Sequence, residues 1–245
     1  HLKQNKLFSF LNVLGLSIGI AGVIFAILYW NEEHSYDKWN PEKDKIYAVM
    51  NDIGGGNVWA VTSAVPAPIL KATTSYLDDY CYFESDYNKE VITYNGKREL
   101  VDKIFTAQSS FFSFFPFEFV HGNAKSAISD RNSIALSEET ADRLFKDEKA
   151  LGKQVKYAGK IFVVRGVYRL NEKSSVMPAA VTTIIEDTLE KDRESWGFSY
   201  GLVLKLKKPK DSTAVVEKLN EIFVEKNYKK QAKEEGLSYE TFLKM

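Results

Sequence analysis

One uninterrupted apolar run, Leu7–Trp30, dominates the pattern of hydrophobic and polar positions, and it contains no charged residue. As a helix rising about 1.5 Å per residue it would be roughly 36 Å long. That is enough to cross a hydrocarbon core about 30 Å thick with some tilt. A secretory signal has a shorter apolar region and a small-residue cleavage site, whereas this run ends in Tyr29 and Trp30. No other stretch is apolar enough to enclose it in a soluble protein, so the pattern predicts one transmembrane helix.

The flanks of the run indicate its orientation. Two lysines precede it, and three acidic residues follow it within Glu32–Asp37. Lysine favours the cytoplasmic side, and aromatic rings gather at the membrane–water interface. We therefore expect residues 1–6 inside and the chain from about residue 31 outside. The expected interface anchors are Lys3, Lys6, Tyr29 and Trp30.

Small residues recur along the same run at spacings that put them on one side of a helix. They are Gly15, Gly19, Gly22 and Ala26. Glycine is common in membrane helices in general, but a small-xxx-small pattern also lets a second helix backbone approach closely. Asn12 and Ser17 could add hydrogen bonds between helices. The run therefore predicts a helix-packing face whose partner helices lie elsewhere.

The rest of the chain alternates between strand and helix patterns and predicts an α+β fold. Residues 46–50 and 80–83 alternate as strands around a helical pattern over 66–79, so 46–83 is predicted to be a β–α–β unit. A second β–α unit is predicted over 201–228. The two units are separated by a stretch that is richer in hairpins than in helices.

Local turn and cap signals define that intervening stretch. Asn95-Gly96 separates two strand-like runs and is the strongest short hairpin signal, and Ala158-Gly159 is expected to close a second hairpin. Ser137 is expected to cap a short helix with two glutamates in its first turn, where the helix dipole favours negative charge. Val181–Ile185 is expected to form a further strand. These elements predict an insert of hairpins and one capped helix.

Six phenylalanines crowd one short segment of the insert. They are Phe111, Phe112, Phe114, Phe115, Phe117 and Phe119. Two interpretations are open: a patch that inserts into the membrane, and a ridge that packs as core against a sheet. Serines and Glu118 interrupt the run, which favours the core ridge.

Composition narrows the function classes. The 33 basic and 33 acidic residues of the chain give a net charge of zero, and a nucleic-acid binder would usually carry a basic excess. The lone Cys81 is expected to be a small buried hydrophobe. The three histidines lack metal-ligand spacing, and Gly54-Gly55-Gly56 is not followed by the Lys-Ser/Thr of a phosphate loop. We therefore predict no catalytic, cofactor or metal site, and expect a protein that binds, positions or transmits.

Several spaced segments carry a family resemblance. Asn5–Gly19, Ser35–Trp39 followed by Ile46-Tyr47, Ser110–Gly122 and Ser137–Gly152 resemble MacB-like/FtsX-like ABC transporter permeases of the Bacteroidota type. The resemblance implies a first membrane helix followed by a periplasmic domain, whose porter-like β–α–β part is split by a mostly β, Sabre-like insert. The implied divisions are 1–30 for the lead-in and helix, 31–83 and 199–245 for the porter-like halves, and 84–198 for the insert.

The resemblance also implies partners and a location. It implies a non-catalytic permease subunit of the bacterial inner membrane, with a cytoplasmic ABC ATPase, a second permease copy in a dimer, membrane lipid, and a periplasmic adaptor or outer-membrane partner. ATP-driven movement would pass through the membrane helices to the periplasmic domain, a mechanism called mechanotransmission, for export or other envelope work. This sequence lacks the family's three further membrane helices and ends where a closing strand of the porter-like part is expected, so we expect a fragment.

One alternative fits the same topology. A single-pass envelope sensor or ligand-binding protein would also have one crossing and an external domain, and only the family segments argue against it. A membrane-anchored hydrolase would need a clustered catalytic set in the fold. The sequence does not specify a transported substrate.

Overall fold

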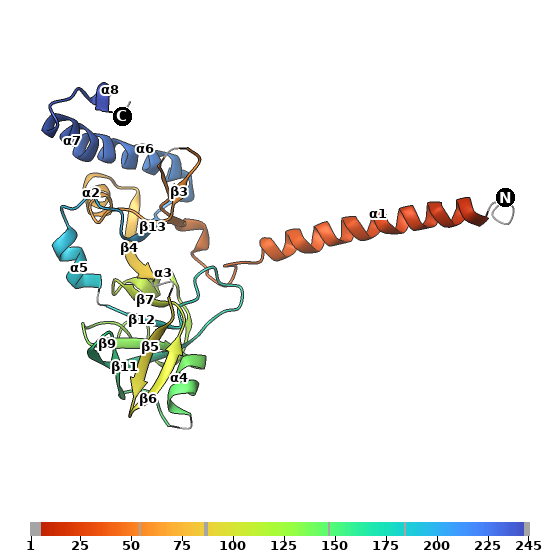
Figure 1. Ribbon diagram of the computed structural model, residues 1–245, viewed down its shortest axis with the longest axis horizontal. Helices are drawn as coiled ribbons and strands as arrows, with labels where there is room; N and C mark the ends of the chain where they lie inside the picture. Colours follow the sequence, from red (N-terminus) through yellow and green to blue (C-terminus); the bar gives the residue numbers. More distant parts are fainter. Residues whose placement is uncertain (1–5, 54, 86–87, 147, 184, 243–245) are drawn as a thin grey trace. The chain divides into compact units, whose positions relative to one another are not determined.

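The computed structural model describes residues 6–53, 55–85, 88–146, 148–183 and 185–242 (Figure 1). The chain divides into two compact units. The first holds the chain up to Trp39 together with Glu172–Ser175, and the second holds Asn40–Asn171 and Val176 onward. Each unit is described by itself below.

The first unit is built on one continuous helix, α1 (Lys6–Glu33), drawn in Figure 1 as a single unbroken ribbon. Every described side chain from Leu7 to Glu33 is exposed except that of Ser9, which is half-buried. The predicted apolar helix is therefore confirmed, and it extends three residues beyond the apolar run. At its end, Ser35 donates from its backbone N–H and its hydroxyl to the Glu32 carbonyl, at 2.9 and 2.7 Å. These bonds satisfy one of the carbonyls left without a partner in the last turn.

The second unit is organised around one sheet. Its strands are β1 (Ile46–Ala48), β4 (Leu77–Ser85), β5 (Glu90–Tyr94), β6 (Lys97–Val101), β7 (Ile104–Ala107), β8 (Glu118–Gly122), β9 (Ser133–Ser137), β10 (Gln154–Tyr157), β11 (Lys160–Arg169), β12 (Ala180–Thr182) and β13 (Gly201–Leu206). In the part of the chain that the structure describes, these eleven strands lie in the order β1-β13-β4-β7-β12-β9-β11-β10-β5-β6, with β8 paired to β11. The pairs β7–β12 and β9–β11 are parallel, and the other pairs are antiparallel.

Helices and short elements complete this unit. The helices are α2 (Pro66–Thr73), α3 (Phe111–Phe114), α4 (Glu138–Phe145), α5 (Ile185–Asp192), α6 (Ser212–Phe223), α7 (Lys229–Glu234) and α8 (Tyr239–Phe242). The 3₁₀ turns are η1 (Lys43–Lys45) and η2 (Pro209–Asp211), a π-helical segment, η3 (Val224–Tyr228), joins α6 to α7, and β2 (Asn51–Asp52) pairs with β3 (Val58–Trp59) in a separate hairpin.

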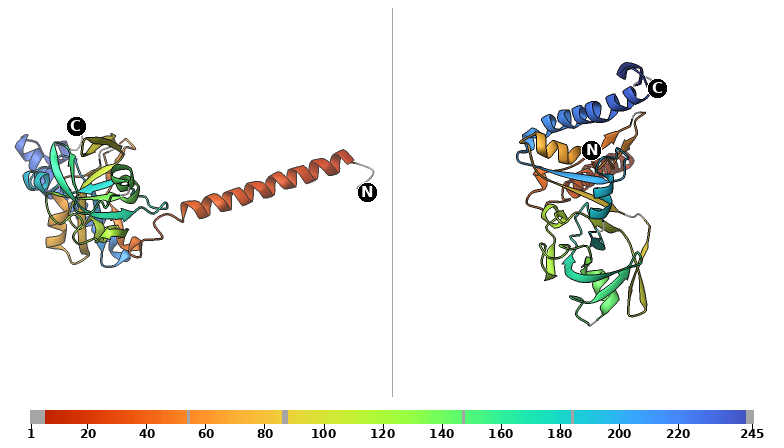
Figure 2. Two further views of the ribbon diagram at one scale, coloured as in Figure 1. Left: turned by 90° about the horizontal axis from the view of Figure 1, so that it is seen from below. Right: turned by 90° about the vertical axis from the view of Figure 1, so that its left-hand side faces the viewer.

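The predicted β–α–β unit is present as β1, α2 and β4, but its two strands are not neighbours. Strand β13 lies between them and is antiparallel to both. Helices α2 and α6 pack against each other (Figure 2, right). Their apolar sides share a core with β4 and β13 that includes Leu70, Tyr82, Leu202, Leu204 and Leu219. The two predicted β–α units, 46–83 and 201–228, therefore form one substructure, in which their helices pack together on β4 and β13.

The helix predicted over 66–79 was too long. Helix α2 ends at Thr73, and Leu77 already begins β4. The hydroxyls of Thr73 and Thr74 donate to the carbonyls of Ile69 and Leu70 at 2.8 and 2.9 Å. Because threonine hydroxyls compete for backbone groups in this way, they favour the end of the helix. Thr74 itself is already extended.

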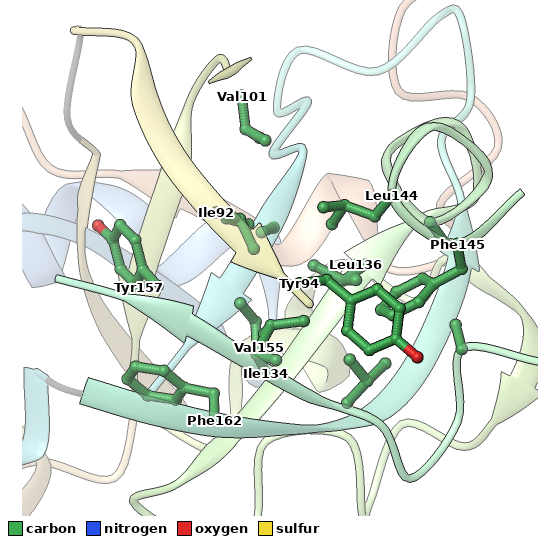
Figure 3. Close-up of a cluster of buried hydrophobic side chains, with 14 of the residues drawn as sticks. Ile92, Tyr94, Val101, Ile134, Leu136, Leu144, Phe145, Val155, Tyr157 and Phe162 are labelled. Carbon is green, nitrogen blue, oxygen red and sulfur yellow. The ribbon is translucent and has the colours of Figure 1, made fainter. Parts of the chain in front are cut away.

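A second core lies between the two predicted hairpins and α4, as Figure 3 shows. It includes Ile92, Val101, Ile134, Leu144 and Phe162, all less than 3% exposed. The hairpins β5–β6 and β10–β11 confirm the turn signals. The turn residues are Asn95 and Gly96, with φ of 46° and 80°, and Ala158 and Gly159, with φ of 47° and 75°. These positive values are the left-handed conformations that a tight hairpin turn requires.

Two further local predictions have different outcomes. The Ser137 cap is confirmed, because the Thr140 backbone N–H donates to the Ser137 hydroxyl at 3.2 Å. The strand predicted over Val181–Ile185 was partly wrong, since β12 ends at Thr182 and α5 begins at Ile185.

The phenylalanine segment is core. Phe111, Phe112, Phe114, Phe115 and Phe117 are buried, and Phe119 is half-buried. Three of these rings contact the buried ring of Tyr168, with centroids 5.3 Å away for Phe112, 5.4 Å for Phe117 and 6.0 Å for Phe119. The core interpretation is therefore confirmed over the membrane-inserting patch.

The predicted division at residues 84 and 199 stays a prediction. Strand β4 runs across the first of these boundaries, and the sheet is continuous on both sides of it. The α+β architecture, with one N-terminal apolar helix and a sheet-rich domain, is confirmed.

Gly122→Ala is expected to destabilise the second unit by about 3 kcal/mol. Gly122 has a φ of +78°, and a Cβ built on it would lie 2.3 Å from the Arg165 carbonyl oxygen. A left-handed conformation costs an L-residue about 1–2 kcal/mol, and an overpacked contact about 1–3 kcal/mol. Urea unfolding of the purified chain measures the loss.

The matched control is Gly152→Ala. Gly152 also has a positive φ, +84°, but a Cβ there meets nothing within 4 Å, so only the conformational cost of about 1 kcal/mol is expected. Equal losses for the two variants would contradict the close backbone approach at Gly122.

Candidate membrane anchor and coupling segment

The small face of α1 is open along its length. A Cβ built on Gly15, Gly19 or Gly22 meets nothing within 4 Å, and no described residue of the membrane-length window is buried. A second backbone could therefore approach this face without a side chain in the way. In the part of the chain that the structure describes, no residue covers this face, so the packing role of Gly15, Gly19, Gly22 and Ala26 stays a prediction.

The polar residues of α1 behave differently from one another. The Ser17 hydroxyl donates to the Val13 carbonyl, one turn earlier, at 2.7 Å. That hydrogen is therefore used within the helix, and Ser17 keeps only acceptor capacity for a neighbouring helix. Asn12 is exposed, so its amide remains the stronger candidate for a bond between helices.

Two of the predicted interface anchors lie on the last turns of α1. Tyr29 and Trp30 are 62% and 64% exposed, respectively, as a lipid-facing belt requires. Trp30 stacks on His34, with ring centroids 3.9 Å apart, and the His34 ring nitrogen Nδ1 lies 2.8 Å from the Trp30 carbonyl oxygen. Lys6 begins the helix, whereas Lys3 lies outside the described residues. The anchoring role of these four residues stays a prediction.

The segment that leaves α1, Ser35–Trp39, is called the exit segment below. In the structure it lies against Glu172–Ser175, which is called the 172–175 loop. The Asp37 backbone N–H donates to the Lys173 carbonyl at 2.7 Å, and the Ser175 backbone N–H donates to Asp37 Oδ1 at 2.9 Å. Asp37 adopts the left-handed conformation, with a φ of 57°, which Asp and Asn tolerate better than most residues. One residue thus makes two hydrogen bonds to a loop distant in sequence.

Charged side chains add to this contact. Lys173 forms an ion pair with Glu32, on the last turn of α1, and its ammonium lies 5.7 Å from the centre of the Tyr36 ring. The Glu32 and Lys173 side chains are 57% and 39% exposed, so this pair contributes little stability by itself. Its effect is to place Lys173 beside the point where the helix ends.

The first residue of the second unit, Asn40, is buried and hydrogen-bonded. Asn40 is 5% exposed. Its side-chain amide donates to the Phe114 carbonyl at 2.8 Å and its Oδ1 accepts the Glu42 backbone N–H at 3.0 Å. Hydrogen bonds from Lys205 and Lys45 lower the pKa of Glu42 below its usual value. The chain that leaves the exit segment is therefore held as soon as it enters the sheet-rich unit.

Two arginines of β11, Arg165 and Arg169, form ion pairs with carboxylates of neighbouring segments. Arg169 donates to both oxygens of Glu138, at 2.8 and 3.1 Å, and to Glu118 at 3.1 Å. The bond from Arg169 lowers the pKa of Glu138. Arg165 pairs with Asp130 at 3.9 Å. Both arginine side chains are exposed on β11.

Burial shifts the pKa of two groups in the sheet-rich unit, the Cys81 thiol and the Glu84 carboxyl. Burial raises the pKa of the Cys81 thiol to about 12, so it stays protonated, as expected for a buried hydrophobe. Burial also raises the pKa of Glu84. Among the residues the structure describes, no group of three His, Cys, Asp or Glu side chains could hold a metal ion.

An apolar groove of about 290 Å³ lies within the second unit, between β1 and α6. Tyr47, Met50, Leu204, Val216 and Phe223 are among the residues that line it. In the described chain no strand pairs with the outer edge of β1. The closing strand expected from the family resemblance stays a prediction.

The described chain thus combines one helix that is long and apolar enough to cross a membrane with a sheet-rich unit. The family of MacB-like periplasmic core domains matches residues 9–222. The chain therefore belongs to that family, and the resemblance to MacB-like/FtsX-like permeases is confirmed. A search of curated proteins gave no match.

Solved structures of the same fold agree. A domain assigned to a permease protein of Porphyromonas gingivalis is 18% identical to this chain, with a TM-score of 0.60. The match covers 74% of this chain and 82% of the Porphyromonas gingivalis domain. The periplasmic region of MacB from Actinobacillus actinomycetemcomitans is 15% identical, with a TM-score of 0.53, covering 75% and 86%. At these identities the likeness establishes the fold.

Sequence reasoning found the helix, its small face and its aromatic end, but missed the contact between the exit segment and the 172–175 loop. The resemblance drew attention to Ser35–Trp39 without saying what the segment touches. No periodic signal links residue 37 to residue 173, because neither lies in a repeating helix or strand.

Proposed function

We propose that this chain is part of a non-catalytic permease subunit of an ABC transporter that works by mechanotransmission. In this proposal α1 crosses the inner membrane, residues 1–6 face the cytoplasm, and the chain from about residue 31 lies in the periplasm. The observation that carries the proposal is that one exposed apolar helix and a MacB-like periplasmic core domain belong to the same chain.

Topology supports a mechanical role. ATP is available in the cytoplasm, whereas the sheet-rich unit of this proposal lies on the other side of the membrane. Energy would then reach that unit as a movement of α1 and of the helices packed on its small face. Close packing at Gly15 and Gly19 would suit this role, because small residues let backbones touch and move as one body. The ATPase activity would reside in a separate cytoplasmic subunit.

The proposed partners follow from the same arrangement. A second permease copy would supply a symmetric dimer, and membrane lipid would contact the rest of α1. A periplasmic adaptor or outer-membrane partner would receive the movement for export or other envelope work. The zero net charge favours protein and lipid partners over nucleic acid.

Reconstitution tests the proposal. The full-length permease is placed in lipid nanodiscs with the ABC ATPase encoded beside it, and copurification and ATP hydrolysis are measured. We expect a stable complex and a rate of hydrolysis that differs severalfold from that of the ATPase alone. The control is a permease of the same family from a different operon.

Absence of a complex, together with unchanged ATP hydrolysis, would contradict the permease role. It would favour the single-pass sensor, for which a downstream kinase gene or a stop codon after Met245 is the genomic counterpart. Three further apolar segments after Met245 would agree with the permease.

A further inference from the structure

The exit segment and the 172–175 loop give the membrane helix a second route into the sheet. The first route is covalent and runs from Trp39 through Asn40 to β1. The second runs through the hydrogen bonds of Asp37 to the loop between β11 and β12. A single peptide chain has two soft dihedrals per residue, φ and ψ, so one covalent connection alone transmits tension but little rotation. Two routes held at different points can pass on both.

Each route ends in backbone that is fixed within the second unit. On the first, Asn40 is buried and bonded to the Phe114 carbonyl. On the second, a few residues after Ser175, the Pro178 carbonyl accepts the buried Tyr168 hydroxyl at 2.6 Å, and the Ala179 carbonyl accepts the Ser137 backbone N–H at 2.9 Å. A movement of α1 that is transmitted along either connection therefore reaches hydrogen-bonded backbone of the second unit within a few residues.

We propose that Asp37 clamps the exit segment to the 172–175 loop, so that movement of α1 is delivered to β11 and β12 as well as to β1. Asp37 is a positioning residue in this scheme, because it acts through the loop. The inference rests on the proposed function, since it names the route by which the helix movement enters the periplasmic unit.

The side-chain chemistry of Asp37 fits the clamp. One oxygen, Oδ1, accepts the Ser175 N–H while the backbone N–H of the same residue donates to Lys173. This double contact requires both a side-chain acceptor and a left-handed backbone. Asparagine keeps both features. Glycine keeps the backbone conformation and loses the acceptor.

Two variants of the full-length permease test the clamp, Asp37→Gly and the matched control Asp37→Asn. Hydrogen exchange at the Ser175 amide reports the clamp itself. In Asp37→Gly this amide is expected to exchange about tenfold faster, as for a lost hydrogen bond to a charged acceptor. In Asp37→Asn it should exchange within about twofold of the native rate. The melting temperature of both variants should stay close to that of the native protein, because the clamp lies outside the two cores.

The functional readout is the change in ATP hydrolysis when each permease is added to its ATPase in nanodiscs. We expect Asp37→Gly to lose most of that change and Asp37→Asn to retain it. Equal behaviour of the two variants, whether both retain or both lose the effect, overturns the clamp. A native Ser175 amide that exchanges as fast as an unprotected one overturns it as well.

Failure of the clamp and failure of the proposed function are distinguishable. If the native permease has no effect on its ATPase, the transporter role fails, and amide exchange at Ser175 then decides the clamp alone. If the native permease alters ATP hydrolysis and Asp37→Gly alters it equally, the function stands and the clamp is wrong.

Discussion

Gly19→Leu is expected to reduce assembly of the membrane complex at least tenfold while the sheet-rich unit stays folded. A Cβ on Gly19 meets nothing within 4 Å in this chain, so the leucine disturbs no internal contact. Its side chain would occupy the space that a partner helix needs for close approach. A tenfold loss corresponds to about 1.4 kcal/mol of association free energy. Copurification with the ATPase and the second permease copy measures it.

The matched control is Ala21→Leu, which makes a similar increase in size away from the small face, because residue 21 points well away from residues 15, 19 and 22 at 100° per residue. We expect near-native assembly for this variant. Native assembly and transport by Gly19→Leu, or equal defects in the two variants, would count against a packing face at Gly19.

Phe111→Ala is expected to lower the free energy of unfolding by about 3–5 kcal/mol, the range for removing a buried aromatic ring. Phe111 is fully buried. Its ring lies 5.0 Å from that of Phe115, 5.3 Å from that of Phe112 and 6.0 Å from that of Phe105, measured between centroids. These neighbours are large and rigid, so they collapse poorly into the cavity. Urea unfolding followed by tyrosine and tryptophan fluorescence measures the loss.

Ile161→Ala provides the comparison on the sheet. Ile161 is 59% exposed, and a truncation at such a surface position usually changes stability by no more than about 0.5 kcal/mol. If Phe111→Ala were as mild as Ile161→Ala, the aromatic segment would not be core, and the membrane-inserting interpretation would return.

Elements whose cause is local could be predicted from the sequence. Asn95-Gly96 forms its own turn, Ser137 carries the oxygen that caps its helix, and the charge-free run Leu7–Trp30 forms one continuous helix. Each of these signals resides within a few residues of the structure that it produces. The packing role of the small face of α1 stays a prediction.

Element ends were harder to place where two signals compete. The run of β-branched residues Val181–Ile185 reaches the first residue of α5, so periodicity alone could not separate strand from helix. Glu186 and Asp187 in the first turn of α5 were the available sign of a helix start. For the helix predicted over 66–79, which ends at Thr73, the hydroxyls of Thr73 and Thr74 were the available sign of its end.

Long-range pairing left no trace in the sequence pattern. Nothing local in Gly201–Leu206 indicates that this strand lies between β1 and β4. The contact of Asp37 with the 172–175 loop has the same character, because it depends on where the sheet places that loop. The candidate coupling site was therefore found only in the structure, although the exit segment itself stood out in the sequence.

The position of β13 has a consequence for biosynthesis. Ile46 of β1 pairs with Lys205 of β13. A ribosome adds about 5–20 residues per second, so β13 is completed roughly 10–30 s after β1, the first strand of the sheet. The hairpins around Asn95 and Ala158 close locally and can nucleate first, since short loops close at low entropic cost. Nascent β1 meanwhile has an unpaired backbone on both sides, so it is a stretch that a chaperone would need to shield.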